Sequence, residues 1–127
     1  MRLSAAATVT SFVVYNRESC CQDRLGTYQV WVGSVAGQTA SPSTLCDTAT
    51  APSSGVGPFV SNCDTATGPH VGNYVTLLLP DSDRILNVAE VQVFVAPTPA
   101  PTPAPTPTGV QATLDAASMS SVYGSYA

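Results

Sequence analysis

Short runs of alternating apolar and polar residues, separated by clusters of Gly, Pro, Asn and Ser, recur along residues 1–95, and no segment has a convincing helical period. This pattern predicts β-strands at about 8–16, 27–33, 73–79 and 85–95. Alternation assigns side chains to faces: Val9, Ser11, Val13 and Tyr15 to one face of the first strand, and Tyr28, Val30 and Val32 to one face of the second. Several short strands of this kind are typical of an all-β fold, a jelly roll or β-sandwich.

Two segments of low complexity define the organisation of the chain. The segment Gly37–Pro69 is rich in Ser, Thr, Pro and Gly and is predicted to be a long loop. A disulfide between Cys46 and Cys63 would close about 17 residues of that loop, stabilising the fold by on the order of 3 kcal/mol. The Pro/Thr/Ala-rich residues 97–108 predict a semi-rigid polyproline II linker, roughly 34 Å long over about 11 residues. We therefore expect one domain over residues 1–96, the linker, and a final segment over 109–127.

The chain is sparsely charged, with 9% charged residues and a formal net charge of −4. A nucleic-acid partner is not expected, because neutralising phosphates requires a basic surface. Membrane insertion is not expected either, since apolar runs such as 75–80 are far shorter than the roughly 20 residues of a spanning helix. The hydroxyl-rich composition and four cysteines favour a secreted protein. The stretch 9–15 is better explained as a strand than as a signal peptide, so an export signal is expected upstream of Met1, or the chain is a fragment.

The adjacent residues Cys20 and Cys21 lie in the segment Asn16–Leu25, with Arg17 and Arg24 on either side. Neighbouring cysteines close only an eight-membered ring, whose Cα atoms are about 3.8 Å apart, and the turn is rigid and strained. The residues alone leave two interpretations: a vicinal disulfide at a functional site, or a surface loop whose cysteines are an incidental pair or bond to distant partners. The two guanidinium groups, likewise, either bind ligand oxygens or pair with acids on the rim of the loop.

The motif resembles the sugar site of the F-type lectins, the fucose-binding fucolectin family, whose signature places two basic residues around a vicinal cysteine pair. Ser19 stands where that signature has an aspartate. Residues 71–80 are similar to the family's Gly-x-Tyr-Val strand ending in Leu-Pro, and residues 85–94 to its closing strand. The resemblance covers about residues 5–95, the later two-thirds of such a domain, and implies an N-terminally truncated module.

The resemblance implies a connectivity and a sugar site. It supports the disulfides Cys20–Cys21 and Cys46–Cys63 over the two other pairings. It implies that the Cys20–Cys21 disulfide packs against a sugar ring while Arg17 and Arg24 bind its axial hydroxyl and ring oxygen.

The resemblance also implies half of a structural calcium site, because Glu90 and the backbone carbonyl of Ala89 match ligands of the family's closing strand. Calcium takes six to eight oxygen ligands, so we expect the ion in the full-length module and not in this fragment. The family histidine precedes the first arginine, and no histidine precedes Arg17 here. His70 is predicted to be a solvated loop residue, and Arg84 to lie in a turn distant from the sugar site.

These observations predict a secreted carbohydrate-binding module for fucose-type glycans, and the alternative is a structural module of an extracellular coat or matrix. An enzyme is not expected, because the chain has no Gly-x-Ser-x-Gly elbow, zinc motif or phosphate-binding glycine loop. The segment 109–127 is either a polar tail or, by its similarity to the opening strand of an F-type or discoidin-like domain, the start of a further repeat. Self-association, or contact with neighbouring repeats, is expected through unpaired strand edges.

Overall fold

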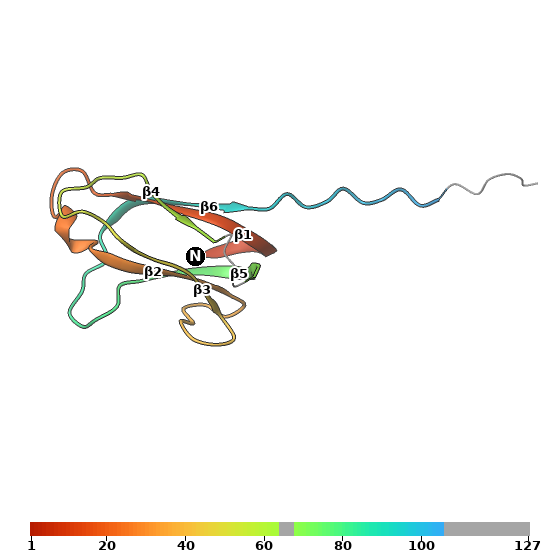
Figure 1. Cartoon of the computed structure of the whole chain (residues 1–127), viewed down its shortest axis with the longest axis horizontal. Helices are drawn as coiled ribbons and strands as arrows, with labels where there is room; N and C mark the ends of the chain where they lie inside the picture. The colour runs from red at the N-terminus through yellow and green to blue at the C-terminus, as the bar shows by residue number, and fades with distance from the viewer. Residues whose placement is uncertain (64–67, 106–127) are drawn as a thin grey trace, which may run out of the picture.

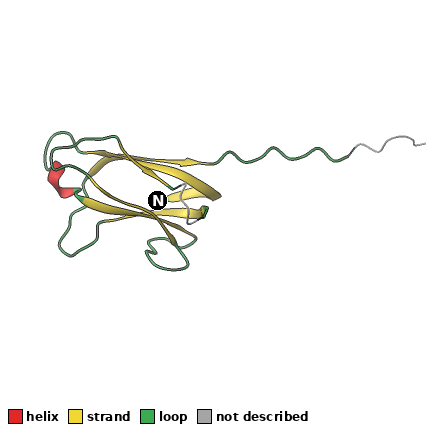
Figure 2. Cartoon of the chain, viewed as in Figure 1, coloured by secondary structure: helices red, strands yellow, loops and turns green. Residues whose placement is uncertain are grey.

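The computed structural model describes residues 1–63 and 68–105, and Figure 1 shows them as a β-domain with an extended tract leaving one end. The elements in chain order are β1 (Arg2–Asn16), the 3-10 turn η1 (Gln22–Arg24), β2 (Thr27–Gly33), β3 (Thr44–Thr50), β4 (Phe59–Asn62), β5 (His70–Leu78) and β6 (Val88–Val95). All the strand pairs are antiparallel, in the order β3-β2-β5-β1-β4, with β6 paired to β1. The sheet folds over into two layers and nearly closes into a barrel (Figure 2). The predicted all-β, sandwich-like fold is confirmed.

Strand β1 belongs to both layers. Its first part pairs with β5, from Arg2 opposite Tyr74 to Val9 opposite His70. Its second part lies between β4 and β6. The predicted strand at 8–16 is therefore only the second part, because the small residues before it carry no strong alternation and are held extended by pairing with β5.

A bulge at Thr10 reverses the face that β1 turns to the core. Val9 pairs with Val95 while Ser11 pairs with Phe94, so Thr10 is an extra residue on β1. One extra residue shifts the alternation by one position. Before the bulge an odd-numbered residue, Val9, points into the core. After the bulge even-numbered residues do so, and Phe12 and Val14 are fully buried in the core. The prediction that Val9, Ser11, Val13 and Tyr15 share one strand face is wrong, because the bulge places Val9 on the opposite face from the other three.

Strand β2 has the predicted bounds, and Tyr28, Val30 and Val32 are all buried on its inner face. The predicted loop between Gly37 and Pro69 is wrong, because β3 and β4 both lie within it. Neither strand has enough bulky apolar residues to be recognised by alternation, and each forms by pairing with a neighbour, β3 with β2 and β4 with β1.

The disulfide between Cys46 and Cys63 joins the two ends of the strand order. Cys46 is the extra residue of a bulge in β3, because Val30 pairs with Asp47 and Trp31 with Leu45. Cys63 follows β4 directly, and the Cα atoms of the two cysteines are 4.6 Å apart. The predicted pairing is confirmed, and it links β3 and β4, the first and last strands of the main sheet path.

The chain leaves the domain after β6 as an extended tract. Residues 97–105 have no regular hydrogen-bonded structure and are exposed, and Figure 1 shows them running away from the strands. This agrees with the predicted polyproline linker as far as residue 105. Residues 106–108 and the segment 109–127 lie outside the described residues. None of the described elements is a helix long and apolar enough to cross a membrane.

Candidate functional site

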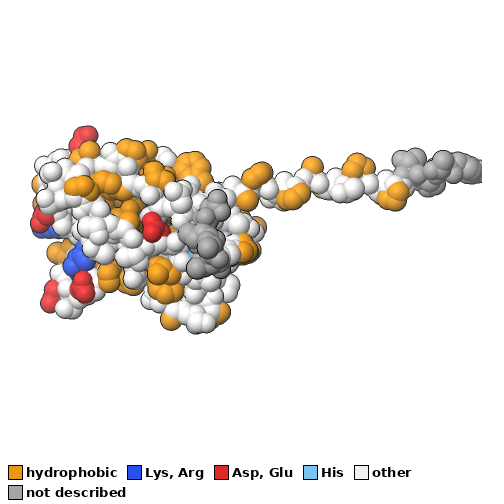
Figure 3. All heavy atoms as spheres, in the orientation of Figure 1, with side chains coloured by type: hydrophobic (Ala, Val, Ile, Leu, Met, Phe, Trp, Pro, Cys, Tyr) orange, Lys and Arg blue, Asp and Glu red, His pale blue; other side chains and the backbone are white. Residues whose placement is uncertain are grey.

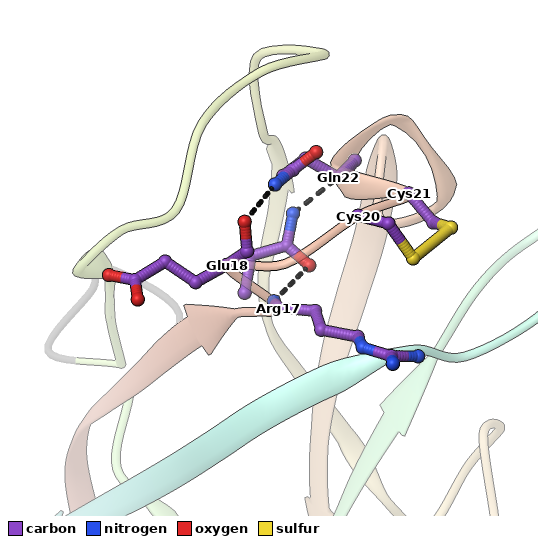
Figure 4. Close-up of a disulfide and its surroundings, with 6 residues drawn as sticks. Arg17, Glu18, Cys20, Cys21 and Gln22 are labelled. Carbon is purple, nitrogen blue, oxygen red and sulfur yellow. Dashed lines mark hydrogen bonds between the residues drawn. A yellow bond between two sulfur atoms is a disulfide. The ribbon is translucent and has the colours of Figure 1, made fainter.

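The loop that follows β1 carries the paired cysteines at one end of the domain. Residues 17–20 are exposed, η1 then turns the chain, and buried Leu25 fixes its return into β2. Figure 4 shows the disulfide at the tip of this loop, with Arg17 extending on the same side and Glu18 pointing the other way. The loop therefore presents a cation and a sulfur surface together to solvent.

Cys20 and Cys21 form the predicted vicinal disulfide, with Cα atoms 3.8 Å apart. Cys21 has a φ of 66°, in the left-handed region that few residues other than glycine adopt. It is also the N-cap of η1, where its carbonyl accepts a hydrogen bond from the Arg24 N–H at 3.1 Å. The ring is thereby joined directly to the turn that carries the second arginine.

Asn16 fixes the base of the loop. Its side chain is buried, and Nδ2 donates to the carbonyls of Gln22 at 2.8 Å and Gly55 at 3.0 Å. Its Oδ1 accepts the backbone N–H of Arg17 at 2.8 Å. Gln22 in turn donates from Nε2 to the Glu18 carbonyl at 2.7 Å. These bonds hold the two ends of the loop against each other, an arrangement that requires no ligand.

Arg84 holds the other side of the loop. Its Nη2 contacts the carbonyls of Leu25 at 2.7 Å, Thr27 at 3.2 Å and Arg24 at 3.4 Å, and its Nη1 donates to the Pro80 carbonyl at 3.1 Å. The expectation that Arg84 lies in a turn distant from the candidate site is therefore wrong. The turn before β6 folds back so that this guanidinium supports the backbone of Arg24 from beneath.

The side chains of Arg17 and Arg24 are exposed and have no ion pair with any residue that the structure describes. The alternative in which they pair with Glu18 or Asp23 is thus not what the described residues show. Most of the charged side chains visible in Figure 3 gather at the end of the domain away from the linker. The two guanidinium groups, whose residues flank the disulfide in sequence, are therefore accessible to a ligand in solvent.

The predicted metal ligands lie beside this loop but are separate from the arginines. Ala89 and Glu90 are exposed at the start of β6. With Glu18, Tyr15 and the backbone near Gly57 they line a cavity of about 400 Å³. Two carboxylates, those of Glu18 and Glu90, line this cavity, and the described part of the chain has no group of three or more His, Cys, Asp or Glu that could hold a metal ion.

His70 is not a solvated loop residue. It begins β5 opposite Val9, is only 1% exposed, and its Nδ1 lies 3.0 Å from the Thr44 hydroxyl. Thr44 belongs to β3, so this contact ties two strands of one layer. The histidine was misassigned because the surrounding Gly, Pro and Thr residues conceal the start of the strand.

The buried Tyr28 carries the clearest shift in pKa. Burial raises the pKa of its phenol, the charge of Asp47 raises it further, and the nearby Ser61 hydroxyl acts in the opposite direction. The hydroxyl groups of Tyr28 and Ser61 are both buried without a hydrogen-bond partner in the described structure. Tyr28 lies in the core, so this shift concerns stability rather than the candidate site.

Sequence reasoning identified the four exposed or half-exposed residues of the site, Arg17, Cys20, Cys21 and Arg24, and the structure places all four on one loop. It missed the two supporting residues, Asn16 and Arg84. Asn16 precedes the motif directly and its side chain can both donate and accept, which is the only local signal for it. Comparisons of the chain with protein-family models, curated proteins and solved structures found no match in any of the three.

Proposed function

We propose that this chain is a carbohydrate-binding module of fucose type, whose site is the loop carrying Arg17, Arg24 and the Cys20–Cys21 disulfide. The observation that supports this most directly is the exposed vicinal disulfide between two arginines that have no acidic partner among the described residues. The similarity of the same residues to the F-type lectin signature supplies the substrate class. A secreted location and placement within a repeated protein accompany the proposal.

The chemistry of the loop suits a deoxyhexose. Such a sugar offers hydroxyl and ring oxygens as acceptors and a small apolar face with a methyl group. A guanidinium is a rigid fork of donors that can bind two adjacent oxygens in a fixed orientation. The disulfide presents a polarizable surface that directs no strong donor at the apolar face, so it can pack there without leaving a polar group unpaired.

The rigidity of the loop supports binding by a small site. Asn16 and Arg84 hold its backbone through six hydrogen-bond contacts between 2.7 and 3.4 Å, formed before any ligand arrives. Little conformational entropy is then lost on binding. A shallow monosaccharide site still reaches only about millimolar to tens of micromolar affinity, so repeated modules would be needed for strong attachment.

The test is titration of the full chain with L-fucose, D-galactose and D-glucose, followed by NMR shifts of the backbone amides. We expect saturable shifts confined to residues 17–26 with fucose and smaller ones with the other sugars. Arg17→Ala and Arg24→Ala each remove charge-assisted bonds of about 1.5–3 kcal/mol, so each should weaken binding about tenfold or more. Arg2→Ala is the matched control, because Arg2 is an exposed arginine on β1 outside the loop.

Two outcomes would overturn the proposal. A folded chain that shows no saturable shift with any of the three sugars has no site of this kind. That result would favour the alternative, a structural module of an extracellular coat or matrix. Equal binding by the parent, Arg17→Ala and Arg24→Ala would place any sugar site elsewhere.

A further inference from the structure

An apolar groove lies between the two layers on the side away from the Cys46–Cys63 disulfide. It has a volume of about 290 Å³ and is lined by Phe12, Val75, Leu77, Leu86, Val88 and Val91, with Met1 at its rim. Leu86 is 50% exposed and Met1 48% exposed. Large apolar side chains are therefore in contact with water along a concave surface between β5 and β6.

Part of the β5 backbone at this groove has no strand partner on one side among the described residues. Met1 and Val75 exchange two backbone hydrogen bonds, N–H of Val75 to O of Met1 at 2.9 Å and the terminal amine to O of Val75 at 2.5 Å. Beyond Val75, residues 76–78 of β5 pair with β2 on one edge, and no residue in the described ranges pairs with their other edge. An exposed strand edge beside an apolar groove is a template for an added strand.

The sequence of the chain supplies a segment of matching pattern. In residues 110–116 apolar and polar residues alternate strictly, with Val110, Ala112, Leu114 and Ala116 at one parity and Gln111, Thr113 and Asp115 at the other. Such a segment, when extended, has one apolar face and one polar face. The segment lies outside the described residues, so its role in the proposal rests on this sequence pattern alone.

The linker determines which copy of the segment can reach the groove. The chain leaves β6 after Val95, about 23 Å along the strand from Val88 at the groove. The described part of the proline tract, residues 97–105, then extends away from the domain, roughly 28 Å at about 3.1 Å per residue. A chain would have to reverse its own semi-rigid tract to fill its own groove, whereas a second copy meets the segment without bending it.

We propose that residues 110–116 of one copy bind the groove of a second copy as an added strand along β5, with their apolar side chains turned inward. The contact joins two different surfaces, so it propagates from chain to chain unless two chains close reciprocally. The assembly uses a surface separate from the sugar site: no residue of the loop 17–24 lines the groove, although Val88 at the groove pairs with Asn16 at the base of that loop.

The test is sedimentation velocity of the full chain over a wide concentration range. We expect reversible association that Leu114→Asp, on the apolar parity, weakens about tenfold or more. Thr113→Asp places the same charge on the opposite parity and should leave association unchanged. Both substitutions lie outside residues 1–96, which carry the described strands, and urea unfolding of each variant checks that the stability of the domain is unchanged. Leu86→Ser tests the groove itself at an exposed position and should weaken association without unfolding the chain.

A synthetic peptide of residues 109–117 provides a second measurement, because it should compete with association and shift the amides of residues 76–79. A chain that stays monomeric throughout the concentration range would overturn the proposal. So would equal association of the Leu114→Asp and Thr113→Asp variants, or association that the Leu86→Ser change leaves intact.

Discussion

Replacement of Arg84 by alanine should destabilise the domain although its guanidinium lies at the surface of the barrel. Four backbone carbonyls surround its two terminal nitrogens, three of them around Nη2. Nη2 carries only two hydrogens, so its three contacts cannot all be full hydrogen bonds. We count the shortest contact of each nitrogen as a full hydrogen bond, Nη2 to the Leu25 carbonyl and Nη1 to the Pro80 carbonyl. Charge-assisted bonds contribute about 1.5–3 kcal/mol each when buried, and the side chain is 23% exposed, so the expected loss is about 2–4 kcal/mol.

The neighbouring carboxylate adds little to this value. Asp81 is 3.9 Å from Nη1 and its side chain is 82% exposed, and such ion pairs contribute about 1 kcal/mol at most. Arg84→Lys should therefore recover only a small part of the loss, because one ammonium cannot reach carbonyls on both sides of the turn. Arg2→Ala, an exposed arginine in β1, is the matched control.

Urea unfolding gives the free energies directly, and hydrogen exchange of the amides in residues 24–27 reports on the loop. We expect Arg84→Ala to lower the unfolding midpoint and to speed exchange there more than in β5. A free energy of unfolding within about 0.5 kcal/mol of the parent would refute the assignment of Arg84 as a structural support. An Arg84→Lys variant as stable as the parent would show that the positive charge at this position, rather than the shape of the guanidinium, stabilises the domain.

Three further changes should have distinct effects. Asn16→Ala should lower the free energy of unfolding by about 2–3 kcal/mol by removing three part-buried hydrogen bonds to the backbone, with the exposed Asn62→Ala as its control in thermal melts. Removing the disulfide by Cys46→Ala with Cys63→Ala should cost about 3 kcal/mol in urea unfolding, and no loss would mean that the strand ends are held by other contacts. Tyr28 contributes stability below its ordinary pKa of 10.0 that is lost as the pH rises through its higher folded value. Tyr28→Phe should therefore flatten the decline of stability in alkaline urea titrations, and a decline as steep as in the parent would contradict this.

The sequence predicted those strands that have a clear local alternation of apolar and polar residues. Strand β2 matched residue for residue because Tyr28, Val30 and Val32 occur at period two between turn residues. Strands β3 and β4 were not predicted, because their residues are mostly small or polar and their extended form depends on pairing with strands far along the chain. The bulge at Thr10 was equally hidden, since an extra residue is defined only by its partner strand.

The candidate site likewise has a part that the sequence predicted and a part that it did not. Its exposed residues form one contiguous motif, so the sequence brings Arg17, Cys20, Cys21 and Arg24 together without any knowledge of the fold. Arg84 supports that motif across 59 positions to Leu25, and no local pattern marks such a contact. His70 was assigned to solvent because nothing nearby in sequence shows that β3 covers it.

The cysteine loop and the linker lie at opposite ends of one strand pair. β1 runs into the loop at Asn16, and β6 runs antiparallel beside it into the linker at Val95. Figure 1 shows the linker continuing in line with β6. A pull between a ligand held at the loop and an anchor on the linker therefore acts along the strands and loads the β1–β6 hydrogen bonds together, in shear. Ladder bonds loaded in this way share the tension, whereas a peeling force would break them one after another, so a load along this axis would meet the more resistant geometry of the β1–β6 pair.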